Sequence, residues 1–178
     1  MHAFTSGDEA ELFLNGRSLG KRKKGAFEYR LRWDDVVYEP GELKLVTWRN
    51  GKPWATTSVA TAGAAAGLAL EADRAAIAAD GADLSFVTLR VVDAQGRTVP
   101  RADARIRFSL TGPGDIVATD NGDATSFEPF PSTTRKAFSG QALAIVCGRP
   151  GAAGTLTLRA EADGLAPTQL TLQTRRPQ

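Results

Sequence analysis

The 178-residue sequence predicts an all-β protein with two tandem immunoglobulin-like β-sandwich domains. Short runs in which apolar and polar residues alternate are common, and Gly, Pro, Asn and Asp bound most of them. Runs with the apolar spacing of a helix are scarce. A stretch of small residues, Thr61–Gly67, separates the runs into two groups. We therefore expect a small β-sandwich over residues 1–62, truncated at its N-terminus, and an immunoglobulin-like β-sandwich over residues 63–178.

Two Asn-Gly pairs predict hairpins in the first domain, because both residues tolerate a positive φ. The pair Asn15-Gly16 follows the apolar run Glu11–Leu14. The pair Asn50-Gly51 separates two expected strands, Leu43–Trp48 and Trp54–Thr61. Between the hairpins, four large apolar side chains alternate with charged ones, so we expect a strand that buries them on one face. These side chains are Phe27, Tyr29, Leu31 and Trp33.

The second domain has about seven short expected strands over about 110 residues, as is typical of an immunoglobulin-like sandwich. The first begins at Leu68. The run Ala72–Ala79 is the best local helix candidate, but we expect an edge strand because Ile77 is its only large apolar residue. Leu143–Cys147 is apolar on both faces, as a central strand would be. The other expected strands are Leu84–Val92, Arg105–Leu110, Ile116–Thr119, Thr155–Glu161 and Gln169–Gln173.

The composition excludes several functional classes. The 22 Lys and Arg residues nearly balance the 20 Asp and Glu residues, so a net charge of +2 predicts no nucleic-acid partner. The single Cys excludes an internal disulfide, and the single His, at position 2, excludes a His-based triad or metal cluster in the body of the chain. No apolar run approaches the ~20 residues of a membrane span, and Met1–Asp8 lacks the pattern of a signal peptide. We therefore expect no membrane partner, no metal and no cofactor.

Three tryptophans are candidate carbohydrate or interface contacts: Trp33, Trp48 and Trp54. Indole rings stack well on the apolar faces of sugar rings, and each indole also offers a hydrogen-bond donor. The alternative is that these rings pack in the core, which is the commoner role of Trp in a domain of about 60 residues. Exposed, coplanar rings would favour sugar binding, and buried rings would exclude it.

Other polar and reactive groups have structural interpretations. The basic run Lys21–Lys24 could bind phosphate or an acidic surface, or it could protect a sheet edge from aggregation. Cys147 lies in an apolar strand and is expected to be a small buried hydrophobe. Several acids lie near Gly and Asn, where acids are usually turn formers rather than catalytic pairs or calcium ligands. These acids are Asp34, Asp35, Asp115, Asp120, Asp123 and Glu128.

The segment Asp120–Phe138 is a candidate docking loop. It is rich in turn formers, and its three Phe residues are more large apolar groups than a free polar loop would carry. Pro129 and Pro131 restrict the backbone and lower the entropy lost on docking. We expect the Phe rings to anchor the loop on a protein partner, with Arg135 and Lys136 as a polar rim. The candidate docking residues are Asp120, Asn121, Phe127, Phe130, Arg135, Lys136 and Phe138.

Seven segments, in order along almost the whole chain, carry motifs of a known enzyme family. The first three are Asp8–Gly20 (DEAELFLNGRSLG), Tyr38–Leu43 (YEPGEL) and Ala60–Gly63 (ATAG). The other four are Ala79–Val87, Gly112–Gly114, Asp120–Asp123 and Arg135–Gly140. The first three resemble the fourth domain of bacterial glycoside hydrolase family 2 β-galactosidases. The other four resemble the fifth, C-terminal domain of the same enzymes.

The resemblance implies an accessory region with no catalytic residues of its own. In that family the two catalytic glutamates lie in a (β/α)₈ barrel, and no residue of this chain matches the barrel motifs. The resemblance also implies that the full-length parent hydrolyses terminal β-galactosides and is a periplasmic or secreted bacterial enzyme. This chain would scaffold it through contacts with the catalytic barrel of the same polypeptide or with a second copy of the enzyme. Two alternatives stay open: a carbohydrate-binding module that holds sugar weakly through its Trp residues, and an adhesin-type structural spacer.

Overall fold

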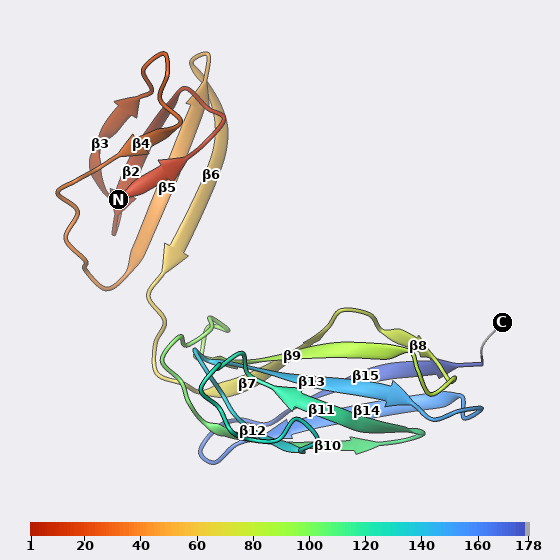
Figure 1. Ribbon diagram of the computed structural model, residues 1–178. Coiled ribbons are helices and arrows are strands. Elements are labelled where there is room, and N and C mark those ends of the chain that lie inside the picture. The colour runs from red at the N-terminus through yellow and green to blue at the C-terminus, as the bar shows by residue number, and fades with distance from the viewer. Residues whose placement is uncertain (177–178) are drawn as a thin grey trace. The chain divides into compact units, whose positions relative to one another are not determined.

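The computed structural model describes residues 1–176, and the chain divides into two compact units, Met1–Thr61 and Ala62–Gln178 (Figure 1). The described residues form fifteen β-strands and no helix, which confirms the predicted all-β class. The strands make four sheets, consistent with two β-sandwich domains. Residues 1–176 contain no helix that is long and apolar enough to cross a membrane.

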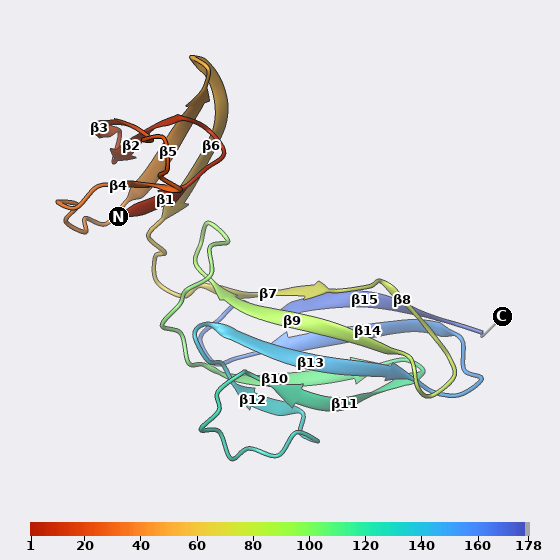
Figure 2. The ribbon, with the colours of Figure 1, turned by 45° about the horizontal axis from the view of Figure 1, so that its top comes forward.

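Unit 1 combines a four-stranded antiparallel sheet with a two-stranded one. The larger sheet has the order β3-β2-β5-β6, and the smaller sheet pairs β1 with β4 (Figure 2). Alternate side chains of a strand point to the same face, so Ala10 and Leu12 of β2 share a small core with Leu31 and Trp33. The strands are β1 (His2–Phe4), β2 (Glu9–Leu14), β3 (Arg17–Lys23), β4 (Arg30–Arg32), β5 (Glu42–Arg49) and β6 (Lys52–Ala60).

Both predicted hairpins of unit 1 are confirmed. Asn15 and Gly16, with φ of 51° and 79°, connect β2 to β3. Asn50 and Gly51, with φ of 52° and 74°, connect β5 to β6. A positive φ at both central residues is the geometry of a type I′ turn, whose twist matches the twist of the flanking strands.

The expected four-residue apolar face between the hairpins is only half correct. Leu31 and Trp33 are buried, but Phe27 is 90% exposed and Tyr29 is 84% exposed. The physical reason is the length of the strand, because β4 contains three residues and pairs only with the equally short β1. Before β4 the chain makes a turn, in which the N–H of Glu28 donates to the carbonyl of Gly25 at 3.2 Å. Alternation assigns side chains to one face only within a paired strand.

Unit 2 consists of two sheets whose facing sides form a single core. One sheet has the order β11-β13-β9-β7, and the other has the order β12-β10-β14-β15-β8. As expected, the strand containing Leu143–Cys147 is central, and the strand within Ala72–Ala79 lies at an edge, parallel to β15. The strands are β7 (Gly67–Ala72), β8 (Ala76–Ala78), β9 (Leu84–Val92), β10 (Arg105–Thr111), β11 (Gly114–Asp120), β12 (Thr134–Lys136), β13 (Gln141–Gly148), β14 (Gly154–Glu161) and β15 (Thr168–Arg175).

The core of unit 2 follows the alternating pattern of its strands. In β10, Ile106 and Phe108 are buried while Arg105 and Arg107 are exposed. In the central strand β13, Cys147 is buried, and this burial raises the pKa of its thiol. Cys147 is therefore a packing residue, as its apolar setting predicted.

Candidate interaction surfaces

The three tryptophans do not form a common platform for a sugar. Trp33 is 2% exposed, and its Nε1–H donates to the carbonyl of Gly20 at 2.9 Å, so both its ring and its polar atom are occupied inside unit 1. This corrects the expectation that Trp33 contacts a ligand or partner: its ring supplies a large share of a small core.

The other two tryptophans are more accessible, but a cation lies over each ring. Trp48 is half-buried, and the Nζ of Lys21 lies 4.2 Å from its ring centroid. Trp54 is half exposed, and the guanidinium carbon of Arg49 lies 5.0 Å from its ring centroid. These cation–π contacts occupy ring faces that a sugar would need. Trp54 is the most accessible of the three tryptophans.

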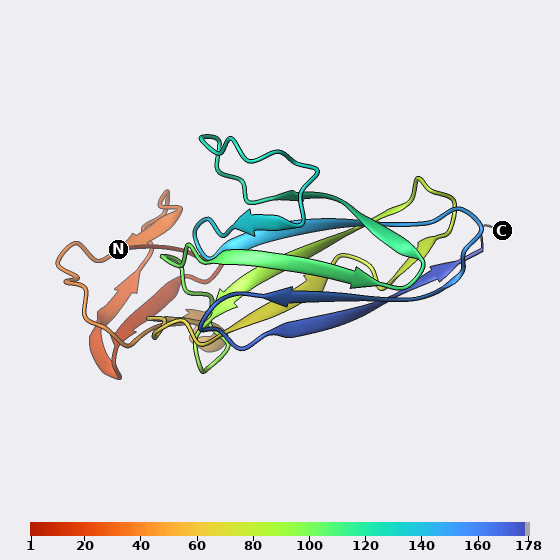
Figure 3. The same ribbon diagram turned by 90° about the horizontal axis from the view of Figure 1, so that it is seen from below.

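A loop of unit 2 carries exposed aromatic side chains. It spans residues 121–133, between β11 and β12, and projects from the sandwich (Figures 2 and 3). Phe127 is 100% exposed, and Phe130 is 60% exposed. Phe138, just after β12, is 47% exposed. We name residues 121–133 the projecting loop.

The projecting loop is held from inside by Arg135, which is 1% exposed. Its Nη1 donates to the carbonyl of Glu128 at 3.0 Å, and its Nη2 donates to the carbonyls of Pro129, at 2.8 Å, and Thr119. This corrects the expected rim position of Arg135: a buried guanidinium is stable because backbone carbonyls accept its hydrogen bonds. Lys136 is exposed and pairs with Asp103 at 2.8 Å.

The acids near the loop have local structural roles. The Oδ1 of Asp120 accepts the N–H of Asn121 at 2.7 Å, and the Oδ1 of Asp123 accepts the N–H of Thr125 at 2.9 Å. Within residues 1–176, no cluster of three or more His, Cys, Asp or Glu could hold a metal ion. These contacts are typical of turn-forming acids.

Glu128 links the loop to two strands. Its Oε1 accepts from Nη1 of Arg105 at 2.7 Å, and its Oε2 accepts the N–H of Lys136 at 3.2 Å. Partial burial raises the pKa of this carboxyl, but the Lys136 N–H and the Arg105 guanidinium outweigh that effect, so the pKa lies below its ordinary value. Asn121 adds a further tie, because its Nδ2 donates to the Lys136 carbonyl at 2.9 Å. The loop is therefore exposed at its aromatic tip and ordered at its base.

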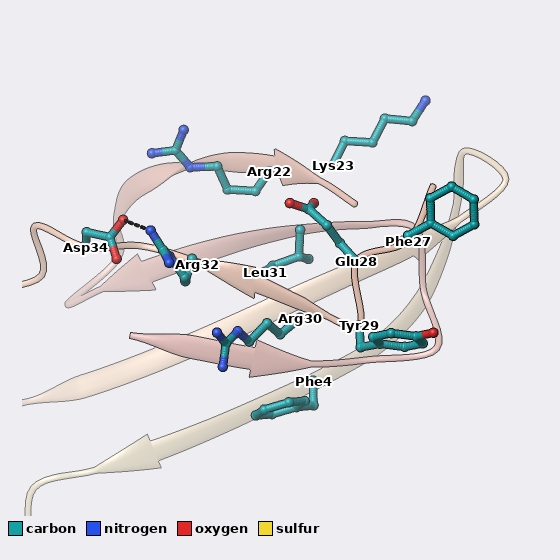
Figure 4. A pocket seen from close by; sticks show the side chains of 10 residues that line it. All are labelled: Phe4, Arg22, Lys23, Phe27, Glu28, Tyr29, Arg30, Leu31, Arg32 and Asp34. Atoms are coloured by element: carbon teal, nitrogen blue, oxygen red, sulfur yellow. Dashed lines mark hydrogen bonds and ion pairs between the residues drawn. The ribbon is translucent and has the colours of Figure 1, made fainter. Parts of the chain in front are cut away.

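Unit 1 contains a groove of about 770 Å³ over β1, β3 and β4 (Figure 4). Leu31, which is buried, belongs to its lining. Three exposed aromatic side chains also line it: Phe4, Phe27 and Tyr29. The alternating sequence pattern singled out Phe27 and Tyr29 but predicted that they would be buried in the core. It therefore did not predict this surface.

Four cations and two acids, Glu28 and Asp34, complete the lining of the groove. The cations are Arg22 and Lys23 from β3 and Arg30 and Arg32 from β4. The basic run that contains Arg22 and Lys23 lies on the edge strand β3 and the residue after it, a position where charged side chains disfavour pairing with another chain. Its outer members have partners: Lys21 pairs with Glu9 at 2.5 Å, and Lys24 donates to the carbonyl of Thr5 at 2.7 Å.

Two protein families match the two units. The family described as Glycoside hydrolase family 2 C-terminal domain 5 matches residues 68–171. The family described as Domain of unknown function (DUF4982) matches residues 1–55.

Two similar proteins match nearly the whole chain. A β-galactosidase of Bacteroides ovatus, BoGH2A, is 39% identical over 91% of this chain, which corresponds to 19% of the length of that enzyme. A crystal structure of a glycosyl hydrolase family 2 member from Bacteroides cellulosilyticus matches 98% of this chain and 22% of its own, with a TM-score of 0.90 and 32% identity.

A β-glucuronidase of Formosa agariphila is 29% identical over 64% of this chain and 12% of its own length. The chain thus spans about a fifth or less of the relatives that it matches, which contain other domains. These matches confirm the resemblance found in the sequence motifs. The chain belongs to glycoside hydrolase family 2 and consists of C-terminal accessory domains of that family.

Proposed function

We propose that this chain is the C-terminal accessory region of a family 2 β-galactosidase and that it scaffolds the enzyme by packing on the other domains. The β-galactosidase activity of the parent enzyme is inferred from the 39% identity with the B. ovatus β-galactosidase over 91% of the chain. The two F. agariphila sequences named β-glucuronidase and putative β-glucuronidase match 64% and 67% of the chain, at 29% and 32% identity. Membership of family 2 favours this function over an adhesin-type spacer.

The acids of the chain support an accessory role. Glycoside hydrolysis requires two carboxyl groups placed on either side of the scissile bond. Asp115 is held in a bidentate pair with Arg149, at 2.6 and 2.9 Å, and Glu128 is held by Arg105. The arginine lowers the pKa of Asp115, so this carboxyl is not suited to act as a general acid near neutral pH.

The projecting loop supports scaffolding by docking. Its Phe127 and Phe130 are exposed, yet the loop base is fixed by Arg135. Aromatic anchors on an ordered backbone are where protein interfaces concentrate their binding energy, since little entropy is lost on docking. Because the relatives contain other domains, a surface on such a domain is the partner that we propose for this loop.

Activity measurements test the proposed parent function. We expect the full-length enzyme that contains this chain to hydrolyse an aryl β-galactoside faster than the matching aryl β-glucuronide. We expect the purified 178-residue chain to hydrolyse neither. Glu128→Gln in the isolated chain is the control for contamination, because a contaminating enzyme would be unaffected by it.

Two results would contradict the proposal, and they are distinguishable. A full-length enzyme that prefers the glucuronide would overturn the β-galactosidase assignment and leave the accessory role standing. Hydrolysis by the isolated chain that is lost on mutating one of its acids would overturn the accessory role.

A further inference from the structure

We infer that the groove of unit 1 is an interdomain interface that binds an acidic protein surface with exposed apolar groups on another domain of the same glycosidase. The residues tested below are the exposed aromatic residues of the groove, Phe4, Phe27 and Tyr29, and two of its cations, Arg22 and Arg30. The inference rests on this chain being part of a larger family 2 glycosidase, but it does not depend on which sugar that enzyme cleaves.

The apolar part of the groove is too exposed for a self-contained unit. Phe4, Phe27 and Tyr29 are 73%, 90% and 84% exposed, and all three line the same groove. An aromatic side chain removes about 150–250 Å² from water when it is buried, so three largely exposed rings match or exceed the about 300–600 Å² of the largest apolar patch on a typical monomer, which is often functional. Covering these rings would therefore provide a large hydrophobic contribution to docking.

The cations of the groove favour a negatively charged partner. Of its two acids, Asp34 pairs with Arg32 at 3.1 Å, and the Oε2 of Glu28 accepts the N–H of Gly25 at 2.8 Å. Within the described residues, Arg22, Lys23 and Arg30 form no ion pair. All three cations line the same groove as the exposed aromatic rings. Acidic groups opposite them would provide charge complementarity.

The residue types favour a protein surface over an acidic sugar. Two of the three rings are Phe, which offer no polar atom to a hydroxyl-rich ligand. Aromatic residues and Arg are the types enriched at protein interfaces. A protein surface can cover the rings with apolar groups and place its acids against the cations.

Amide hydrogen exchange tests the inference by comparing the isolated 178-residue chain with the full-length glycosidase. The reporter is the turn segment 26–29, where the Glu28 N–H bond to Gly25 is a single local contact. We expect exchange in this segment to slow by at least about tenfold in the full-length enzyme, because the docked surface excludes water. The double variant Arg22→Glu/Arg30→Glu should restore fast exchange, as should Phe27→Ser/Tyr29→Ser.

Two controls separate docking from folding. Lys52→Glu reverses an exposed charge outside the groove lining and should leave the protection unchanged. In the isolated chain, both double variants should shift the Tm of unit 1 by less than about 2 °C, because the replaced side chains are exposed.

Three results would overturn the inference. Equal exchange in the isolated chain and the full-length enzyme would show that nothing covers the groove. A large loss of Tm in the isolated chain would show that these residues hold unit 1 together. Slowed exchange in the isolated chain on adding oligogalacturonate would identify an acidic sugar as the ligand instead. The aryl-glycoside assay is independent of all three, so a failed substrate assignment would not be confused with a failed interface.

Discussion

At the scale of single residues, Arg135 decides what the projecting loop can do. Its side chain is buried, and it bonds the carbonyls of Thr119, Glu128 and Pro129. A guanidinium has five N–H donors in a fixed plane, so one residue can join the end of β11 to the loop. A Lys ammonium, which is a compact point charge with three donors, could not cover the same set of acceptors. Because Arg135 fixes the backbone at the base of the loop, the loop stays ordered while Phe127 is exposed to solvent.

The first prediction concerns Phe127 and Phe130. In the isolated chain, we expect Phe127→Ala and Phe130→Ala to change the Tm of unit 2 by less than about 2 °C, because both rings are largely exposed. In the full-length enzyme, the same variants should shorten the half-life of activity on heating, because docking of the loop is weakened. Differential scanning fluorimetry and residual-activity assays measure the two effects.

The matched control is Phe108→Ala, which removes a Phe that is 5% exposed in the core of unit 2. It should cost about 3–5 kcal/mol in the isolated chain. A loss of that size from Phe127→Ala alone would mean that this ring is ordinary core, and docking by the loop would be rejected.

At the scale of elements, Asp93 closes the end of β9. Its side chain is almost fully buried, and its Oδ2 accepts the N–H of Gly63 at 2.8 Å. Its Oδ1 accepts the N–H groups of Gln95 and Arg97, both at 2.9 Å. The bond from Gly63 lowers the pKa of Asp93 most strongly, and together with the other donors it outweighs the effect of burial. One carboxylate thus fixes a turn and the first residues of unit 2.

The second prediction is an acid dependence of unit 2 through Asp93. Its folded pKa lies below the unfolded value of about 3.9, so the stabilisation is complete above that pH and is lost as the pH falls through the folded pKa. Asp93→Asn should lower the Tm of unit 2 at pH 7, because an amide has one acceptor oxygen for three N–H donors. The difference in Tm between the wild type and this variant should stay nearly constant down to about pH 4 and shrink as the pH is lowered further.

Asp103→Asn is the comparison for that measurement. Lys136 is the side chain that lowers the pKa of Asp103. Both the Lys136 ammonium and the Asp103 carboxylate are exposed. Its effect on Tm should be small at every pH, since exposed ion pairs contribute little. A difference for Asp93→Asn that stays constant with pH would show that its charge is not involved.

At the scale of the whole molecule, the two units have unequal cores. Among residues 1–176, the main cluster of buried apolar side chains has sixteen members in unit 2 and five in unit 1. A small domain buries a lower fraction of its chain surface than a larger one, and is correspondingly less stable. We propose that the units are independent domains, with a boundary at residues 62–63.

The third prediction is that unit 1 unfolds first. Calorimetry of the isolated chain should show two unfolding transitions. Leu12→Ala should lower the midpoint temperature of the first transition alone, and Leu89→Ala that of the second alone. Limited proteolysis should cut within residues 61–67 or inside unit 1 before unit 2 is touched. A first cut inside Leu84–Val92, or one transition affected by both variants, would contradict this order.

The sequence by itself determined the two hairpins of unit 1, most of the longer strands and the family. Asn15-Gly16 and Asn50-Gly51 specify hairpins because their φ requirement is local, and the structure has both. The alternation in Arg105–Leu110 likewise identified a strand with one buried face. The motifs of the two domains were sufficient to indicate glycoside hydrolase family 2.

Only the tertiary structure decided which faces are covered. Phe27 and Tyr29 share the alternation of Leu31 and Trp33, but the two-stranded sheet ends before it can cover them, so a groove forms instead of a core. Arg135 follows the polar pattern of a surface residue, yet two carbonyls of the projecting loop and one of β11 surround its guanidinium. Alternation is a property of neighbouring residues, whereas burial depends on chain segments far apart in sequence. The candidate surfaces of this chain therefore depend on long-range contacts that no local pattern encodes.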